Sequence, residues 1–220
     1  MKIHQSLLVL LVSTSMIFTG CKKKAENETT ATDAEAAAAV TVESVKYSAI
    51  PGESIIEWKG SKPTGFHTGT VAVESGVVTV KGDALESGSF LINMNSITVT
   101  DLKPGDGKED LEAHLKGSKK EDQDHFFNVA TYPTGAFEVT GVSQNEGKTM
   151  LEGNLTLKGV KKNISFPVSI GYEGDTMTLT SEPFTINRTL WNVNYASKSI
   201  FSDLGDKFVN DDIELTIKVK

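Results

Sequence analysis

The sequence predicts an all-β protein, an antiparallel β-barrel of about eight strands with one or two short helices. Apolar and polar residues alternate along most segments between Lys46 and Lys220, which is the pattern of strands that bury one face. Turn signals such as "YEGD" at 172–175 separate these segments by short links, so successive strands form hairpins. A sheet of about eight such strands removes its exposed edges by closing into a barrel.

The strands follow from period-two alternation in individual segments. In "FLINMN" Phe90, Ile92 and Met94 lie on one face, and "LEGNLTLKG" places its leucines on one face and its polar residues on the other. Pro167 cannot donate a ladder hydrogen bond, so we expect a bulge or an edge there. The clearest strand segments are 90–95, 151–159, 164–170, 177–180, 184–186 and 213–219.

One segment has helical rather than strand periodicity. In "GKEDLEAHLKGS" Leu111 and Leu115 lie four residues apart, and acidic residues occupy the first turn, where the helix dipole favours them. Gly117 is the expected stop. We expect both leucines to hold this helix against the barrel.

The inward-facing side chains of the strands are the candidate ligand-binding residues. They are aliphatic and aromatic and include no charge, so a cavity among them would be dry and suited to a lipid tail. A solid core predicts the same alternation, and both interpretations are open. The predicted lining residues are Phe90, Ile92, Met94, Phe137, Val139, Leu151, Leu155, Phe166, Val168 and Ile170.

Residues 1–20 are predicted to be a lipoprotein signal peptide. Lys2 precedes an apolar run that is too short for a comfortable membrane span and that ends in "FTGC". Cleavage before Cys21, the one cysteine of the chain, would leave this residue to carry the lipid; the alternative is a signal peptide with an incidental cysteine. Residues 25–44 are small, polar and acidic, which predicts that residues 21–45 form a flexible tether before the barrel domain at 46–220.

Composition and motifs exclude several classes of function. The formal net charge is -7, and it becomes about -8 when the signal takes Lys2 away, which argues against nucleic-acid binding. No nucleotide-binding glycine pattern or catalytic motif occurs, so we predict no enzyme and no cofactor.

The segment "HLKGSKKEDQDHFFN" carries two of the four histidines, His114 and His125. Their spacing fits no zinc motif, so we interpret the charges between them as a solvated loop, assign no metal, and place His114 at the rim of a pocket. Arg188 follows a strand and is a second candidate rim residue. It would either pair with a loop carboxylate, the interpretation that we favour, or face an anionic headgroup at the pocket mouth.

The chain resembles the YceI-like family of secreted, lipocalin-like proteins that bind polyisoprenoids. The resemblance covers about residues 46–220 and rests most strongly on "HLKGSKKEDQDHFFNVATYPTGAF" and "LEGNLTLKGVKKNI". It implies an elongated lipocalin-like barrel whose apolar interior holds an isoprenoid chain, with helical decoration near residues 105–127. It also implies a periplasmic or lipoprotein-borne binder or carrier rather than an enzyme.

We therefore expect non-enzymatic binding, sequestration or transport of a polyisoprenoid or isoprenoid quinone in the bacterial cell envelope. The expected location is the outer membrane, through the lipid anchor, with the barrel in the periplasm. Two alternatives come from other classes: a ligand-free protein-interaction module with a filled barrel, and a metal-dependent hydrolase that uses His114 and His125.

Overall fold

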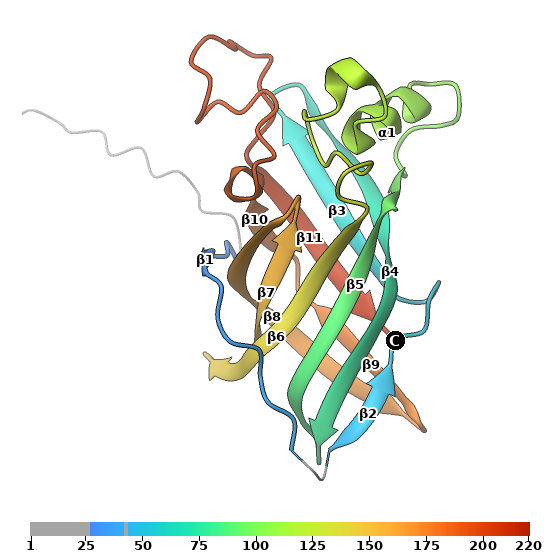
Figure 1. Ribbon diagram of the computed structural model, residues 1–220, viewed down its shortest axis with the longest axis vertical. Helices are drawn as coiled ribbons and strands as arrows, with labels where there is room; N and C mark the ends of the chain where they lie inside the picture. The colour runs from blue at the N-terminus through green and yellow to red at the C-terminus, as the bar shows by residue number, and fades with distance from the viewer. Residues whose placement is uncertain (1–26, 42–43) are drawn as a thin grey trace, which may run out of the picture.

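Eight strands form a closed antiparallel barrel in the computed structural model, which describes residues 27–41 and 44–220 (Figure 1). Three further short strands pair with strands of this ring: β1 with β8, β2 with β4 and β10 with β11. The predicted fold class is confirmed. The elements are β1 (Thr32–Asp33), β2 (Val45–Ser48), β3 (Ile55–Lys62), β4 (Gly65–Lys81), β5 (Ala84–Val99), α1 (Lys108–Lys116), the 3-10 helix η1 (Lys120–Asp122), β6 (Thr134–Asn145), β7 (Lys148–Leu157), β8 (Val160–Glu173), β9 (Thr176–Ser181), β10 (Phe184–Asn187), the 3-10 helix η2 (Arg188–Trp191) and β11 (Asp212–Val219).

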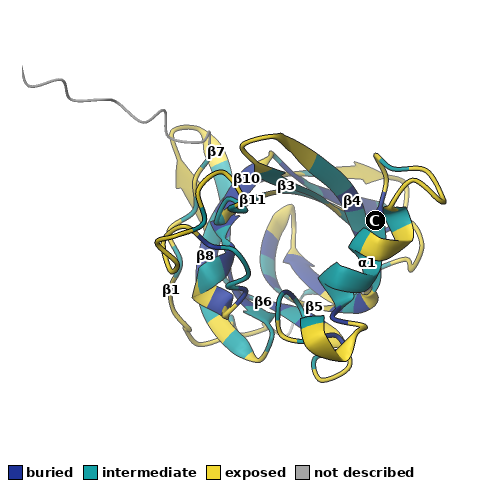
Figure 2. Cartoon of the chain, turned by 90° about the horizontal axis from the view of Figure 1, so that it is seen from above, coloured by how far each residue is buried: buried dark blue, intermediate teal, exposed yellow. Residues whose placement is uncertain are grey.

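From β3 to β8 each strand pairs with the next strand along the chain, so the series of hairpins ends at β9. Strand β11 then closes the ring, because it pairs with β3 on one side and with both β9 and β10 on the other. The contact with β9 is short, from Lys218 to Val219, and the side chain of Ser181 extends it by accepting a hydrogen bond from the Ile217 N–H at 2.8 Å. Figure 2 shows the resulting ring of strands from above.

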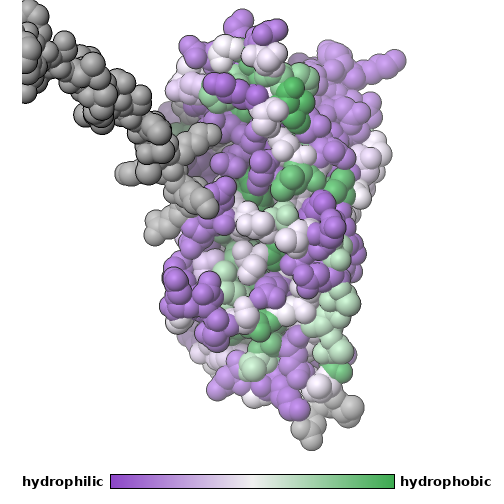
Figure 3. Space-filling model, turned by 90° about the vertical axis from the view of Figure 1, so that its left-hand side faces the viewer, coloured by the Kyte–Doolittle hydropathy of each residue, from purple (hydrophilic) through white to green (hydrophobic). Residues whose placement is uncertain are grey.

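The hydrophobic core fills the end of the barrel that lies away from α1. Phe166 stacks on Phe184 with ring centroids 4.2 Å apart, and it also contacts Phe137 at 5.6 Å. All three rings are buried. The outer face in Figure 3 is mainly hydrophilic with scattered hydrophobic residues, which is what period-two alternation produces in a barrel.

Helix α1 lies over one end of the barrel, hereafter the α1 end (Figures 1 and 2). It ends at Gly117 as predicted, because this residue adopts φ 68° and a Cβ there would lie 2.4 Å from the carbonyl oxygen of Gln123. The Glu112 carboxylate accepts a hydrogen bond from the Val99 N–H at 2.9 Å and so fastens the helix to β5.

Pro167 occupies a regular position in the β7–β8 ladder, opposite Met150, and no bulge occurs there. Its carbonyl accepts from the Glu182 N–H at 3.0 Å, just beyond the end of β9. The side of Pro167 that lacks an N–H therefore lies beyond the last residue of β9, where the ladder has ended. This is the edge position expected for proline, and no bulge is needed.

The predicted flexible tether differs from the structure over residues 27–41, hereafter the N-terminal segment. Strand β1 in this segment pairs with Asn163 and Lys162 of β8. The buried side chain of Asn154 donates to the Glu35 carbonyl at 2.7 Å and accepts from the Glu35 N–H at 2.9 Å. Composition shows only that this segment has few apolar residues to bury, whereas the bonds that dock it are polar and come from the barrel.

The predicted signal peptide at 1–20 and the predicted lipidation at Cys21 lie outside the described residues and stay predictions. No helix in the part of the chain that the structure describes is long and apolar enough to cross a membrane.

Candidate functional site

A cavity of about 370 Å³ occupies the α1 end of the barrel. Strands β3, β4, β5, β7 and β11 form its walls, and α1, the Phe pair at 126–127 and the loop after η2 cover it. The exposed residues Lys62, Phe66 and Lys207 belong to its lining and mark the mouth. Its size falls within the range of small-molecule binding sites.

The predicted lining residues divide between this cavity and a deeper one. Ile92, Met94 and Leu155 line the main cavity. A second cavity of about 60 Å³ lies next to it and shares Ile92 and Leu155. The deeper cavity is also lined by Phe90, Phe137, Leu151 and Phe166.

The remaining predicted lining residues take part in core packing. Val139 and Val168 are buried in the hydrophobic core, and Ile170 packs against that core. None of the three contributes to the lining of either cavity. All ten predicted positions belong to the cavity linings or to the hydrophobic core, and the alternation pattern did not separate the hollow part of the interior from the filled part.

Several lining residues were not predicted. Trp58, Ile97, Leu157 and Leu215 form much of the wall. The alternation in 213–219 already placed Leu215 inward, but no local signal says which inward residues border empty space. The indole of Trp58 lies along the wall.

Gly69 leaves the space that the Trp58 ring occupies. A Cβ on Gly69 would lie 2.3 Å from the indole and 2.0 Å from the carbonyl oxygen of Thr98. No side chain larger than hydrogen fits between them, so the glycine lets the ring lie flat on β4. This arrangement keeps a large aromatic ring in the wall and out of the cavity.

The mouth carries polar and charged groups. His67 lies there, and its Nδ1 is 2.9 Å from Asp101 Oδ2. Burial raises the pKa of Asp101, but the hydrogen bonds from the Thr68 N–H and from His67 outweigh it, so the pKa lies below the ordinary value. The cavity is thus apolar inside and polar at its mouth, which is the distribution that an amphiphile requires.

Arg188 lines the cavity, as the rim prediction requires, and it is buried. Its guanidinium donates to the carbonyl oxygens of Asn210 at 3.0 Å, Val193 at 2.5 Å, Tyr195 at 2.9 Å and Val209 at 3.0 Å. We favoured pairing of Arg188 with a loop carboxylate, and the guanidinium does form an ion pair with Asp211 at 3.6 Å. These partners compensate the burial of the cation, which belongs to η2 and not to the inward-facing set of the strands.

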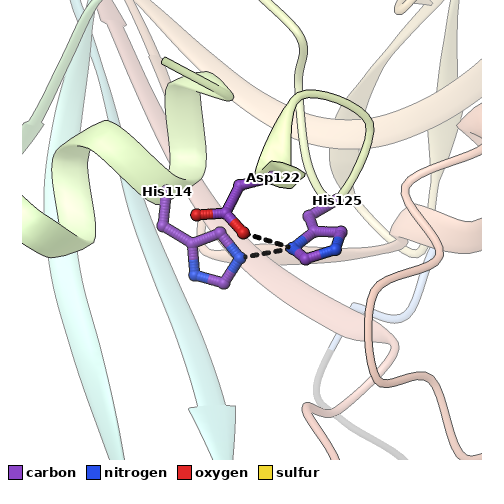
Figure 4. Close-up of side chains that lie close together, drawn as sticks. All are labelled: His114, Asp122 and His125. Carbon is purple, nitrogen blue, oxygen red and sulfur yellow. Dashed lines mark hydrogen bonds and ion pairs between the residues drawn. The ribbon is translucent and has the colours of Figure 1, made fainter. Parts of the chain in front are cut away.

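The other predicted rim residue, His114, also lines the cavity. Its Nε2 lies 2.8 Å from Nδ1 of His125, and that same Nδ1 lies 3.3 Å from Asp122 Oδ1 (Figure 4). Burial lowers the pKa of His114; Asp122 opposes this shift, while His125 and Lys119 add to it. The loop that was interpreted as a solvated charge run therefore folds back so that both histidines meet.

Aromatic rings restrict both histidines. The ring of Tyr195 lies 4.7 Å from His114 and 4.4 Å from His125, and Phe126 meets His114 edge-on at 5.1 Å. The Tyr195 N–H donates to the His125 carbonyl at 3.3 Å. Helix α1, the following loop and the loop after η2 are therefore joined at one point beside the mouth.

The ring of strands and the apolar cavity define a small closed β-barrel of the class that encloses one ligand. A family model for the YceI-like domain matches residues 47–220. The chain belongs to the YceI-like family.

Related proteins agree with this assignment. The chain is 28% identical over 141 residues to UPF0312 proteins of Yersinia pestis (strain Pestoides F) and Yersinia pseudotuberculosis serotype O:3 (strain YPIII). The match covers 64% of this chain and 64% of each relative, so it spans just under two thirds of the relatives' own length.

Two solved structures share the fold. Burkholderia cenocepacia BcnA matches with a TM-score of 0.58 and 20% identity, over 76% of this chain and 94% of that chain. A polyisoprenoid binding domain from Saccharophagus degradans, implicated in plant cell wall breakdown, matches with a TM-score of 0.53 and 14% identity, over 78% and 95% of the two chains. At these identities the likeness concerns the fold alone.

Proposed function

We propose that this protein binds a long-chain apolar lipid, a polyisoprenoid or an isoprenoid quinone, and sequesters or carries it without chemical change. The observation that carries the proposal is the cavity of about 370 Å³, apolar inside and polar at its mouth. Membership of the YceI-like family and the fold shared with a polyisoprenoid binding domain support it.

The binding energy would come mainly from the tail. Each buried CH₂ group contributes roughly 0.8 kcal/mol, so an apolar chain needs few polar contacts. The aromatic core below the cavity limits how much of the tail the interior accepts. The alternative of a wholly filled barrel matches only this lower part, because the α1 end is hollow.

The proposed place of action is the bacterial cell envelope. The support is the sequence of residues 1–21, which predicts a signal peptide and an acylated Cys21. An acyl anchor in the outer membrane would keep the barrel beside the bilayer from which an isoprenoid lipid is drawn.

Mass spectrometry of an organic extract tests the proposal directly. The full chain, purified from bacteria, should release a stoichiometric isoprenoid lipid, and delipidated protein should take up an added short-tailed isoprenoid quinone. Recovery of lipid-free protein that takes up no quinone would contradict the proposal.

Two neighbouring residues of β5 provide a matched pair of variants. Ile92 points inward and lines both cavities, whereas Leu91 is 45% exposed on the outer face. Ile92→Trp should fill the cavity and abolish quinone uptake, and Leu91→Trp should leave uptake unchanged. Equal uptake by both variants would show that the lipid binds elsewhere.

A further inference from the structure

Three metal-ligating side chains converge beside the cavity mouth. His114 comes from α1, Asp122 ends η1 and His125 follows three residues later. One ligand atom from each lies within 4.8 Å of the others. In Figure 4 the imidazole of His114 and the carboxylate of Asp122 both point toward Nδ1 of His125.

We propose that His114, Asp122 and His125 form a binding site for a divalent transition-metal ion of the zinc class. Two imidazole nitrogens and one carboxylate oxygen are the donors that such ions prefer, whereas Mg²⁺ and Ca²⁺ prefer oxygen donors alone. Three protein ligands leave the fourth position of a tetrahedral ion for water.

Two of the three donor separations are close to those that an ion imposes, and the third, between His114 and Asp122, is within 4.8 Å. Zinc to nitrogen bonds of about 2.0–2.1 Å in a tetrahedron place neighbouring donors roughly 3.3 Å apart. The separation of His125 Nδ1 from Asp122 Oδ1 is 3.3 Å. The two imidazole nitrogens are 2.8 Å apart and need to separate by only about half an ångström.

The protonation states also fit. A metal needs the unprotonated nitrogen of a neutral imidazole, and burial lowers the pKa of His114, which favours its neutral form. At 2.8 Å one imidazole donates its N–H to the other. Metal binding therefore requires that the donor ring move this proton to its other nitrogen.

The surrounding structure holds the ligands in place. The Phe127 N–H donates to the Leu115 carbonyl at 3.1 Å, and the Val129 N–H donates to the Lys116 carbonyl at 2.9 Å, so the loop is fastened to the end of α1. The Asp122 side chain is 25% exposed and that of His125 is 37% exposed, which leaves a path for an ion. Lys119 opposes a cation, but it lies 3.9 Å from the Asp110 carboxylate, which offsets its charge in part.

Metal titration of the full chain tests this site. A Cys21→Ser background removes the single cysteine as a competing ligand, and the protein carries no histidine tag. After treatment with a chelator, the chain should bind one Co²⁺ with the visible absorption of a four-coordinate ion, and one Zn²⁺ should displace it. Mg²⁺ should not displace it.

Variants assign the site to these residues. Asp122→Asn and His125→Ala should each weaken Co²⁺ binding by at least about tenfold, with circular dichroism unchanged. His67→Ala is the matched control, because His67 also lines the cavity and lies 2.9 Å from a carboxylate but, among the residues that the structure describes, belongs to no cluster of three metal-ligating side chains. The proposal is overturned if no stoichiometric Co²⁺ or Zn²⁺ binds, or if the His67 variant loses as much affinity as the other two.

Discussion

Arg188 is a buried cation whose hydrogen bonds hold the loop after η2 over the barrel. Its four carbonyl partners come from both ends of that loop, at 193–195 and at 209–210. Burial lowers the pKa of Arg188, and Asp211 opposes this shift. The residue therefore acts on the cavity by fixing its cover, and four of its five N–H donors bond to backbone carbonyls of the protein.

Replacing Arg188 by Met should lower the free energy of unfolding by about 3 kcal/mol, because the carbonyls lose their charged donor and Asp211 is left without its cation. Urea unfolding followed by circular dichroism measures this change. Arg188→Lys should recover only part of the loss, since an ammonium cannot span all four carbonyls. A Met variant as stable as the native chain would show that the loop is held by other contacts.

The lowered pKa of His114 predicts a dependence of stability on pH. Well above pH 6.5, the ordinary pKa of histidine, the His114 imidazole is neutral in both the folded and the unfolded chain. As the pH falls, the unfolded chain takes up the proton first, because the folded pKa is lower, so the free energy of unfolding decreases.

His114→Gln should therefore lose less stability than the native chain between pH 7.5 and pH 5.5. Urea unfolding at both pH values, with a chelator present, measures the difference. Asp122, His125 and Lys119 also act on this histidine and are unchanged in the variant. Identical losses in the two proteins would contradict the prediction.

At the scale of elements, the N-terminal segment is an added layer on the barrel wall. The amide of Asn154 bonds both backbone groups of Glu35, and Asn163 donates to Asn154 at 3.2 Å. The Ala38 N–H also donates to the Val139 carbonyl at 2.9 Å. Polar bonds therefore hold much of this segment, and Ala31 adds an apolar contact with the core.

Asn154→Ala should release this segment while the barrel stays folded. Hydrogen exchange of residues 27–41 should become fast, and the free energy of unfolding should fall by about 1–3 kcal/mol, because buried polar partners lose their bonds. Asn145→Ala, at an exposed turn of β6, is the control and should change neither quantity. Unchanged protection at 27–41 would show that the β1–β8 pairing is sufficient by itself.

At the scale of the whole molecule, docking of the N-terminal segment shortens the link to the proposed lipid anchor. Only five residues lie between Cys21 and Asn27. A fully extended chain spans at most about 3.6 Å per residue step, so the six steps span roughly 20 Å. An acylated Cys21 would therefore keep the barrel close to the bilayer rather than far from it.

Cys21→Ser should move the protein from the membrane fraction to the soluble fraction of a bacterial lysate, because stable attachment requires the acyl chains. The melting temperature should be unchanged, since the bonds that form the barrel lie within the described residues 27–41 and 44–220. Fractionation with immunodetection measures the first effect and calorimetry the second. Retention in the membrane fraction would contradict the lipid anchor.

Local patterns in the sequence determined the fold class and one helix. Period-two alternation specifies which side chains of a strand face inward, and the Leu111 and Leu115 spacing with Gly117 specifies α1 and its end. These features depend on neighbours within a few residues. They could therefore be predicted without knowledge of the tertiary structure.

Only the tertiary structure decided where the interior is hollow and which polar groups meet. Phe166 and Phe184 stack from β8 and β10 and fill one end, while Trp58 lies flat on Gly69 and leaves the other end open. His114 reaches His125 because the chain turns back after Gly117. The size of the cavity and the meeting of the two histidines depend on strands and loops that are far apart in the sequence. Alternation within one strand carries no information about either.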